Sequence, residues 1–397
     1  MRYDAVIVGA SVAGAAAAAL LARQGLRIAL LDKARFPRDK VCGEGLMPAG
    51  VGILREMGVL ARLTCGQSFQ GIRFIEAESG ATVELDFSLI SPDLRGRAFP
   101  RLALDGALAE FAAESPGVEW MQETQADSVR VNRSGVEVCI RRRGGRRTIQ
   151  GRLLIGANGI RSRLPRRFAI KRHIARHRRF ALRARFDRYR GDTTMVDVHC
   201  HRAGEAYVAP QPQGGALVTM LLHHRGSPLG GAKPQSFLRL LDGFPRLQAE
   251  LEGSRTPSQV QAAAPLGQRL ERCHGRRLLL LGDAAGAVDP VTGQGMSIAL
   301  KDARLAADLL ARRLPEGRLD EADLSDFSRR RNEYFLPAYR MAEDLISALR
   351  HPFLARRTLR SLNRNLDLRR KILAQAAQDG PPAALAWTDK LRLVMGF

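Results

Sequence analysis

The sequence has no apolar run of the roughly 18 residues that a membrane-spanning helix needs. It also lacks a basic segment followed by an apolar one at its start, so we expect neither a membrane span nor a secretory signal. Cysteines are few, odd in number and without metal-ligand spacing, which predicts free thiols in a reducing, cytoplasmic setting. They are Cys42, Cys65, Cys139, Cys200 and Cys273.

Acidic residues are scarce relative to basic ones, 40 against 63, which gives a formal net charge of +23. A charge of this sign attracts anionic partners. The sequence lacks zinc-finger spacing and ribonucleoprotein-type aromatic motifs, so we expect no binding to nucleic acid. The apolar fraction of 45% is that of an ordinary globular chain and excludes disordered and fibrous classes.

The periodicity of apolar residues divides the 397-residue chain into distinct parts. At its start the pattern predicts a strand, a glycine turn, a helix (15–24) and a second strand. Over 71–87 and 193–224 apolar and polar residues alternate, which is the period of a β-strand. The pattern after residue 302 is helical. We therefore predict an α/β fold with a Rossmann-like domain, an interleaved antiparallel β-sheet substrate domain and C-terminal helices. The predicted boundaries are 1–70, 101–165 and 270–318 for the first domain, 71–100 and 166–269 for the second, and 319–397 for the helices.

The first candidate site is a glycine turn, GASVAG, between the first strand and the first helix. Gly9 allows a tight turn, and Gly14 allows the helix to approach the strand closely. Ser11 stands where the usual pattern has a second glycine. Asp32 ends the next strand, where its carboxylate can accept a hydrogen bond from a ribose hydroxyl. This context favours dinucleotide binding over an alanine-rich packing helix.

The second candidate site follows the apolar strand 153–155, where the turn contains Asn158 and Gly159. Taken alone, this segment fits an ordinary turn at a strand end better than it fits a site.

The third candidate site is the most informative. The apolar run 278–281 ends in Gly282 and Asp283, and a loop then leads to a helix that begins near Ser297. Gly293 and Gly295 leave backbone N–H groups uncovered at the start of that helix, where negative charge is stabilised.

Together the three sites resemble the flavoprotein family that includes single-component aromatic hydroxylases, geranylgeranyl reductases and flavin-dependent halogenases. The resemblance implies an FAD-binding domain of the glutathione-reductase type. The sequence has no second dinucleotide fingerprint, so we expect no separate nicotinamide domain. The hydride would come from transiently bound NAD(P)H or from another reductant. The residues expected to bind FAD are Gly9, Ser11, Gly14, Asp32, Lys33, Arg101, Asn158, Gly159, Gly282, Asp283, Gly293, Gln294, Gly295 and Met296.

Different segments resemble different members of this family. The segment 36–45, with Cys42, resembles the reductases, whereas the run 293–296 resembles the hydroxylases. The Trp-x-Trp signature of the halogenases is missing. Ala209 replaces a bulky ring that relatives often carry, which predicts a wide pocket for a lipophilic substrate. The residues expected near the reaction are Cys42, Tyr207, Pro290, Gly293 and Gly295.

We predict an FAD-dependent monooxygenase that hydroxylates a lipophilic aromatic or polycyclic ring through a flavin C4a-hydroperoxide. The alternative is a flavin-dependent reductase of isoprenoid or other C=C bonds. A halogenase and a non-catalytic escort of prenylated partners are the remaining hypotheses.

Four histidines lie on or near the predicted substrate sheet: His199, His201, His223 and His224. Because no acidic or cysteine ligand lies at helpful spacing in the sequence, we expect polar strand or cavity residues and no metal site.

The segment 350–371 carries eight basic residues and one acidic residue. A leucine stripe, placed on one helical face, is formed by Leu359, Leu362, Leu366 and Leu373. This pattern fits peripheral binding to an anionic membrane surface or to an acidic acyl carrier protein. It also fits a solvated helix that covers the flavin domain with its leucines.

Overall fold

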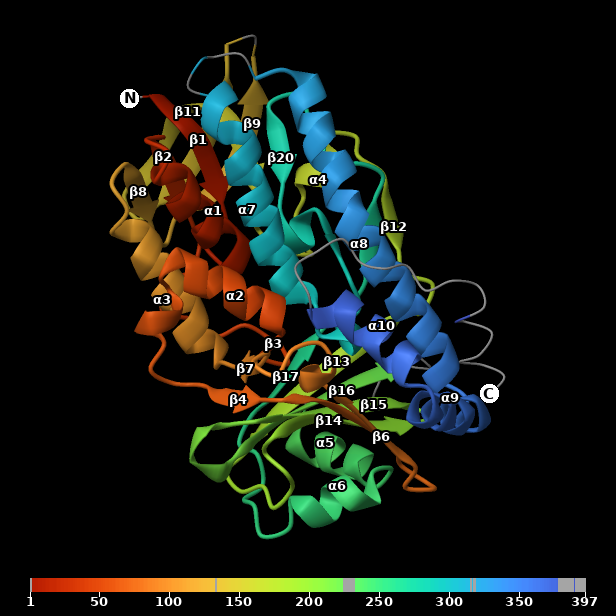
Figure 1. Ribbon diagram of the computed structural model, residues 1–397. Coiled ribbons are helices and arrows are strands. Elements are labelled where there is room, and N and C mark those ends of the chain that lie inside the picture. The colour runs from red at the N-terminus through yellow and green to blue at the C-terminus, as the bar shows by residue number, and fades with distance from the viewer. Residues whose placement is uncertain are drawn as a thin grey trace.

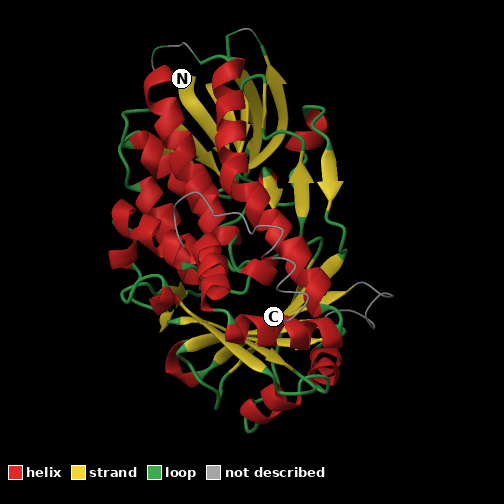
Figure 2. Ribbon diagram, turned by 45° about the vertical axis from the view of Figure 1, so that its right-hand side comes forward, coloured by secondary structure: helices red, strands yellow, loops and turns green. Residues whose placement is uncertain are grey.

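The computed structural model describes residues 2–132, 134–223, 233–314, 316, 319–377 and 389 (Figure 1). A largely parallel sheet and its helices form the upper part in this view, and a second sheet lies below. Long helices run along one side from the first sheet to the second (Figure 2). The predicted α/β fold with an inserted sheet and C-terminal helices is therefore confirmed.

The first sheet is built around β1 and β11, which pair in parallel. β2 and β20 extend the parallel pairing on either side, and a hairpin of β9 and β10 joins β11 in antiparallel fashion. Because the parallel strands are covered on both faces, they are almost continuously apolar. The path runs β19 (His274–Gly275), β20 (Leu278–Leu280), β11 (Gly145–Gly156), β1 (Arg2–Val8), β2 (Ile28–Leu31) and β8 (Val118–Met121), with β10 (Val136–Arg142) and β9 (Gln125–Val131) attached to β11.

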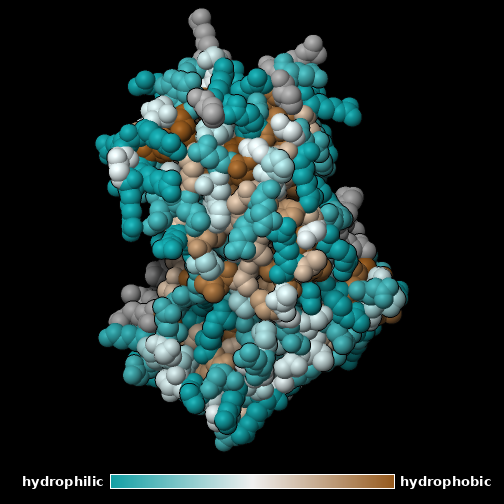
Figure 3. Space-filling view, turned by 90° about the vertical axis from the view of Figure 1, so that its left-hand side faces the viewer, coloured by the Kyte–Doolittle hydropathy of each residue, from teal (hydrophilic) through white to brown (hydrophobic). Residues whose placement is uncertain are grey.

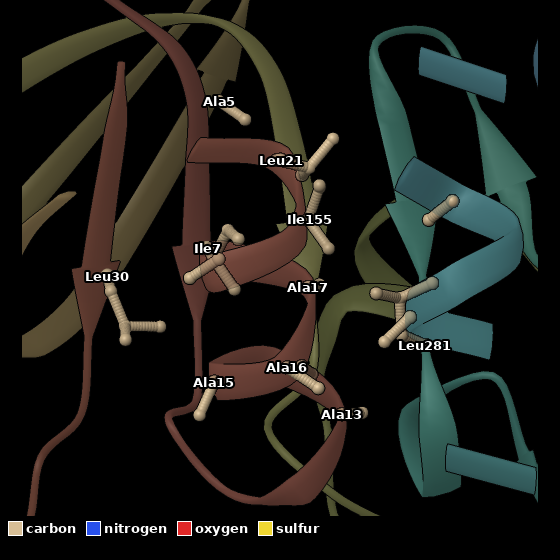
Figure 4. Packing of buried hydrophobic residues seen from close by; sticks show 14 of the residues in the cluster. Ala5, Ile7, Ala13, Ala15, Ala16, Ala17, Leu21, Leu30, Ile155 and Leu281 are labelled. Atoms are coloured by element: carbon tan, nitrogen blue, oxygen red, sulfur yellow. The ribbon is translucent and has the colours of Figure 1, made fainter. Parts of the chain in front are cut away.

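Helix α1 (Val12–Ala22) is an alanine run, and alanine has the highest helix propensity. It packs against α7 (Gly295–Arg313) and α3 (Arg101–Ala113) beside the first sheet. The small side chains of Ala13, Ala16 and Ala17 lie on the side turned towards Leu281 (Figure 4). Small residues here allow the helices and the strands to approach closely, which fixes the turn before α1.

In the second sheet, β14 (Met195–His201) shows the predicted alternation, with Val198 and Cys200 on one face and Asp197 and His199 on the other. One of its neighbouring pairs, β14 with β5, is parallel, so the sheet is not antiparallel throughout as predicted. Chain distance explains the difference, because β5 and β14 belong to separate segments that no hairpin connects. The order is β17 (Val260–Ala263), β13 (Arg179–Phe186), β16 (Ala216–His223), β15 (Gly204–Pro210), β14 (Met195–His201), β5 (Gly71–Glu76) and β6 (Thr82–Asp86).

Shorter elements connect these layers. Two small sheets are β12 (Arg172–Ile174), β18 (Gln268–Leu270) and β21 (Gly286–Ala287), and β3 (Gly45–Leu46), β7 (Gly96–Ala98) and β4 (Gln67–Phe69). The remaining helices are α2 (Pro48–Met57), α4 (Leu164–Arg167), α5 (Pro234–Leu241), α6 (Pro245–Glu250), α8 (Glu321–Leu349), α9 (Pro352–Arg364) and α10 (Leu366–Ala377). Among the described residues, none of these helices combines the length and the apolar character that crossing a bilayer requires. Hydrophilic side chains cover much of the face shown in Figure 3.

The predicted leucine stripe is divided between two helices, because the chain leaves helical geometry at Asn365. Leu366 is exposed, so the prediction of one continuous apolar face is wrong. The other three leucines pack in a core cluster with Phe74 and Leu85 of the second sheet, rather than over the first sheet. Binding of this basic region to an anionic surface or an acidic carrier protein stays a prediction.

Candidate active site

The glycine turn before α1 has the geometry that an anionic ligand requires. Gly9 has φ of +105°, and a Cβ on Gly14 would lie 1.8 Å from the Gly9 carbonyl oxygen, so both positions require glycine. Asp32 accepts a hydrogen bond from the Ala10 N–H at 2.9 Å, which connects β2 to the turn. Lys33, the next residue, is exposed.

The first turn of helix α1 contains no carboxylate that could cap its N-terminus, and the Ser11 hydroxyl makes no capping hydrogen bond within the described chain. Ser11 Oγ instead lies 3.0 Å from an Asp105 oxygen and accepts from the Arg101 guanidinium at 2.8 Å. Arg38 approaches Asp105 at 3.3 Å. The N–H groups at the start of α1 fit a pyrophosphate, whereas Arg101 is buried and pairs with Asp105 at 2.7 Å.

The second and third sequence sites meet around one lysine. Lys40 Nζ lies 3.5 Å from the Asp283 carboxylate, and a Cβ on Gly159 would lie 4.0 Å from the same Nζ. Gly282 donates its N–H to Asp302 on α7 at 2.8 Å. Asn158 lies exposed at the tip of its turn. The structure therefore brings segments far apart in the sequence to one edge of the first sheet.

The loop that precedes α7 contains polar groups that lack protein partners. Gly293 has φ of +65° and reverses the chain just before the helix begins at Gly295. A Cβ on Gly295 would meet no atom within 4 Å, so space is open beside the helix start. Buried polar atoms without a hydrogen-bond partner in the described chain lie on Thr292, Gln294 and Ser297. Buried polar atoms without a partner at this helix start fit a polar ligand that completes their hydrogen bonds.

Cys42 lies at this same loop. Its sulfur is 4.0 Å from the Met296 sulfur at the start of α7, and it accepts the Glu44 N–H at 3.3 Å. The thiol is partly exposed. Glu44 has φ of +63°, an unfavourable conformation for a residue with a side chain.

A network of arginines holds Glu44 in place. Its buried carboxylate accepts from the Arg101 N–H at 3.1 Å and from the Arg183 guanidinium at 3.2 Å, and Arg185 contacts it as well. Arg183 also donates to the Cys42 carbonyl at 3.2 Å. Since Arg183 and Arg185 belong to β13, the second sheet positions the cysteine segment beside the loop.

Tyr207 and a buried ionic cluster support the loop from below. The Tyr207 hydroxyl donates to the Val291 carbonyl, next to Pro290, at 2.8 Å. Arg179 contacts Glu205 and also lies 3.2 Å from Asp289, whose carboxylate caps the Val291 N–H at 3.1 Å. Burial raises the pKa of the Glu205 and Asp289 carboxyls, although Arg179 opposes the shift. Two buried carboxyls around one guanidinium favour sharing a proton.

Several residues of the site had only weak sequence signals. Lys40 and Glu44 lie in the segment that resembles the reductases, but nothing in one sequence pairs them with Asp283 or Arg183. Arg179 and Glu205 each stand beside apolar residues on their own strands, β13 and β15. That pattern indicates which face of the sheet each side chain is on, but it does not show that the two side chains are in contact.

The histidines do not form one cluster. His199 is buried, whereas the His201 ring lies edge-on against Phe244. His223 is at the end of β16, and His224 lies outside the described residues.

His223 makes stability depend on pH. Burial, followed by the charges of Arg179 and Arg350, lowers its pKa from 6.5 to about 4. Between these values the unfolded chain binds a proton that the folded chain does not. His223 therefore reduces stability as the pH falls from 6.5 towards 4, and this penalty is absent above 6.5. Urea unfolding of wild type and His223→Asn at neutral and mildly acidic pH should show a smaller acid loss in the variant; equal losses would contradict the assignment.

Comparison with known proteins identifies what this arrangement belongs to. The family model described as FAD binding domain matches residues 2–335. The chain belongs to this FAD-binding family.

Relatives and solved structures extend the comparison. Menaquinone reductase of Mycolicibacterium smegmatis (strain ATCC 700084 / mc(2)155) is 32% identical over 78% of this chain and 76% of its own length. Digeranylgeranylglycerophospholipid reductase of Methanocella arvoryzae is 27% identical over 82% of both chains. The structure of the flavin-dependent brominase Bmp2 superposes with a TM-score of 0.85 at 19% identity, covering 99% of this chain and 97% of that one. The last likeness concerns the fold alone, whereas the family shows an FAD-dependent oxidoreductase.

Proposed function

We propose that this FAD enzyme reduces C=C bonds of a lipophilic, polyprenyl-type substrate. The observation that carries the proposal is the position of Cys42 at the start of α7, where Glu44 and Arg183 hold its segment. This segment resembles the geranylgeranyl reductases, and two relatives are named menaquinone reductase and digeranylgeranylglycerophospholipid reductase. Hydroxylation of a lipophilic ring remains the alternative prediction.

Bound FAD would supply hydride once it is reduced. The turn 9–14 and Asp32 would hold its ADP part, and the pair of Lys40 and Asp283 lies where the second and third candidate sites meet. The N–H groups at the start of α7 stabilise negative charge that lies close to them. Burial raises the pKa of the Glu205 and Asp289 carboxyls below the same loop, and this pair would be the source of the proton. Reduction of an alkene requires both a hydride and a proton, so this arrangement suits it.

We also propose NAD(P)H as the reductant. A surface hollow of about 560 Å³ lies beside the second turn. Its lining includes five cationic side chains, which suit the phosphate groups of a nicotinamide dinucleotide. They are Arg161, Arg163, Arg166, Lys171 and Arg172.

The deciding experiment reduces the FAD-loaded protein without oxygen and then adds either a polyprenyl alkene or an oxygen pulse with an aromatic acceptor. We expect anaerobic reoxidation by the alkene and a product that is two hydrogens heavier. A product that gains one oxygen atom, formed only after the pulse, would support hydroxylation and overturn the proposal.

Glu205→Gln is expected to slow alkene reduction by about 10²-fold, the scale of a lost general acid. The glutamine amide still offers Arg179 a polar partner, but it cannot act as a general acid as a protonated carboxyl does. Stopped-flow measurement should show unchanged reduction of FAD by NAD(P)H, a slower second half-reaction and partial rescue by Glu205→Asp. If both half-reactions slow equally, the pair is merely structural.

A further inference from the structure

A second buried polar cluster lies on the opposite face of the second sheet. Asp197 and His199 are two residues apart on β14, so their side chains leave the sheet on the same side. Val198, between them, stands opposite Tyr207 and faces the loop before α7. Glu250 ends α6, which packs below the sheet (Figure 1). One ligand atom from each of Asp197, His199 and Glu250 lies within 4.8 Å of the other two.

Two of these three groups are unsatisfied. Asp197 Oδ1 and His199 Nε2 are buried without a hydrogen-bond partner in the described chain. The whole residues are 0% and 1% exposed, respectively. A buried polar atom without a hydrogen-bond partner destabilises the folded state. An ion between them would remove that cost.

The other oxygens of the two carboxylates are already held. Arg73 donates to Asp197 Oδ2 at 2.8 Å, and Arg246 donates to Glu250 Oε1 at 2.9 Å. The Tyr189 hydroxyl lies 3.3 Å from Glu250 Oε2 and 3.2 Å from Asp197 Oδ2. Outer contacts of this kind orient the ligands of metal sites.

The charge of the cluster leaves room for a dication. Besides Asp197, Arg73 approaches Asp192 at 3.1 Å and Glu84 at 3.5 Å. With Glu250 and Arg246 added, four carboxylates face two guanidiniums, which leaves a charge of −2. A neutral imidazole nitrogen is the form of histidine that binds a metal ion.

We propose that Asp197, His199 and Glu250 bind one divalent transition-metal ion, with Zn²⁺ the best fit. One imidazole nitrogen and two carboxylate oxygens suit Zn²⁺ better than Mg²⁺ or Ca²⁺, which take oxygen ligands. Tetrahedral bonds of about 2.0–2.1 Å put ligand atoms about 3.3 Å apart, so the side chains must close inward. The ion fastens α6 to β14 and serves the fold of the substrate sheet. This site does not depend on the proposed reaction.

The prediction that these histidines form no metal site considered spacing in the sequence alone. Glu250 lies far along the chain from β14 and joins the cluster only because α6 folds back under the sheet.

The test uses the full-length, FAD-loaded protein, without an affinity tag and freed of metal by a chelator. Titration with ZnCl₂ by calorimetry should give one ion per chain with submicromolar affinity, and the thermal midpoint should rise with Zn²⁺ concentration. His199→Asn and Glu250→Gln should weaken binding at least about 10-fold to 100-fold, as loss of a ligand or its support does. His201→Asn, two residues along the same strand, should leave it unchanged.

Loading the wild-type protein with Co²⁺ tests the site by absorption spectroscopy. This measurement does not depend on whether the variants fold. The wild-type protein should show the absorption bands of a four-coordinate site with nitrogen and oxygen ligands. Absence of Zn²⁺ binding, a thiolate-to-metal charge-transfer band, or equal affinity in wild type, His199→Asn and Glu250→Gln would overturn the proposal.

Discussion

Arg331→Met is expected to lower the free energy of unfolding by about 3–5 kcal/mol, the cost of leaving a buried charge unpaired. Arg331 of α8 pairs with Asp302 of α7 at 2.9 Å, and both side chains are almost wholly buried. The same guanidinium donates to the Ala285 and Gly286 carbonyls at 3.3 Å. Methionine fills similar space but leaves Asp302 without its cation. Chemical denaturation of the purified variant measures the loss.

A matched control exists on the same helix. Arg329 is exposed and pairs with Asp326 and Glu333 within one helical turn, so Arg329→Met should change the free energy of unfolding far less than Arg331→Met. Equal losses in the two variants would refute the assigned role of Arg331. Because Asp302 also accepts the Gly282 N–H, Arg331→Met should in addition weaken FAD binding, which Arg329→Met should not.

Gly14→Ala is expected to weaken FAD binding by about 10-fold to 100-fold, from the 1–3 kcal/mol that overpacking a tight contact costs. The added Cβ would lie 1.8 Å from the Gly9 carbonyl oxygen, so either α1 or the turn must move. Both elements border the site expected for the pyrophosphate. The ratio of flavin to protein absorbance and a titration with FAD measure the effect.

Gly52→Ala provides the comparison, because it is also a helical glycine but an added Cβ there meets no atom within 4 Å. It should bind FAD as wild type does and gain slightly in stability, since alanine favours helices. Similar flavin content in Gly14→Ala and wild type would show that the close contact does not shape the site.

Local signals in the sequence identified the glycine turn, Asp32 and the loop before α7, because each depends on residues adjacent along the chain. Long-range charge pairs could not be found in this way. Arg331 is one arginine among many, and only the packing of α8 on α7 selects it as the partner of Asp302. The parallel pairing of β5 with β14 likewise depends on the completed sheet. The leucine stripe failed because helical periodicity continued in the sequence across a break at Asn365.

The place of β20 in the first sheet has a consequence for protein synthesis. β1, β2 and β11 leave the ribosome well before β20, which pairs with β11 and leads to Gly282 and Asp283. Until β20 emerges, the nascent chain exposes an open edge of β11, which can pair with other chains. The residues expected to bind FAD are therefore not all present until most of the polypeptide has been translated. Chaperones that shield strand edges should increase the yield of FAD-loaded enzyme.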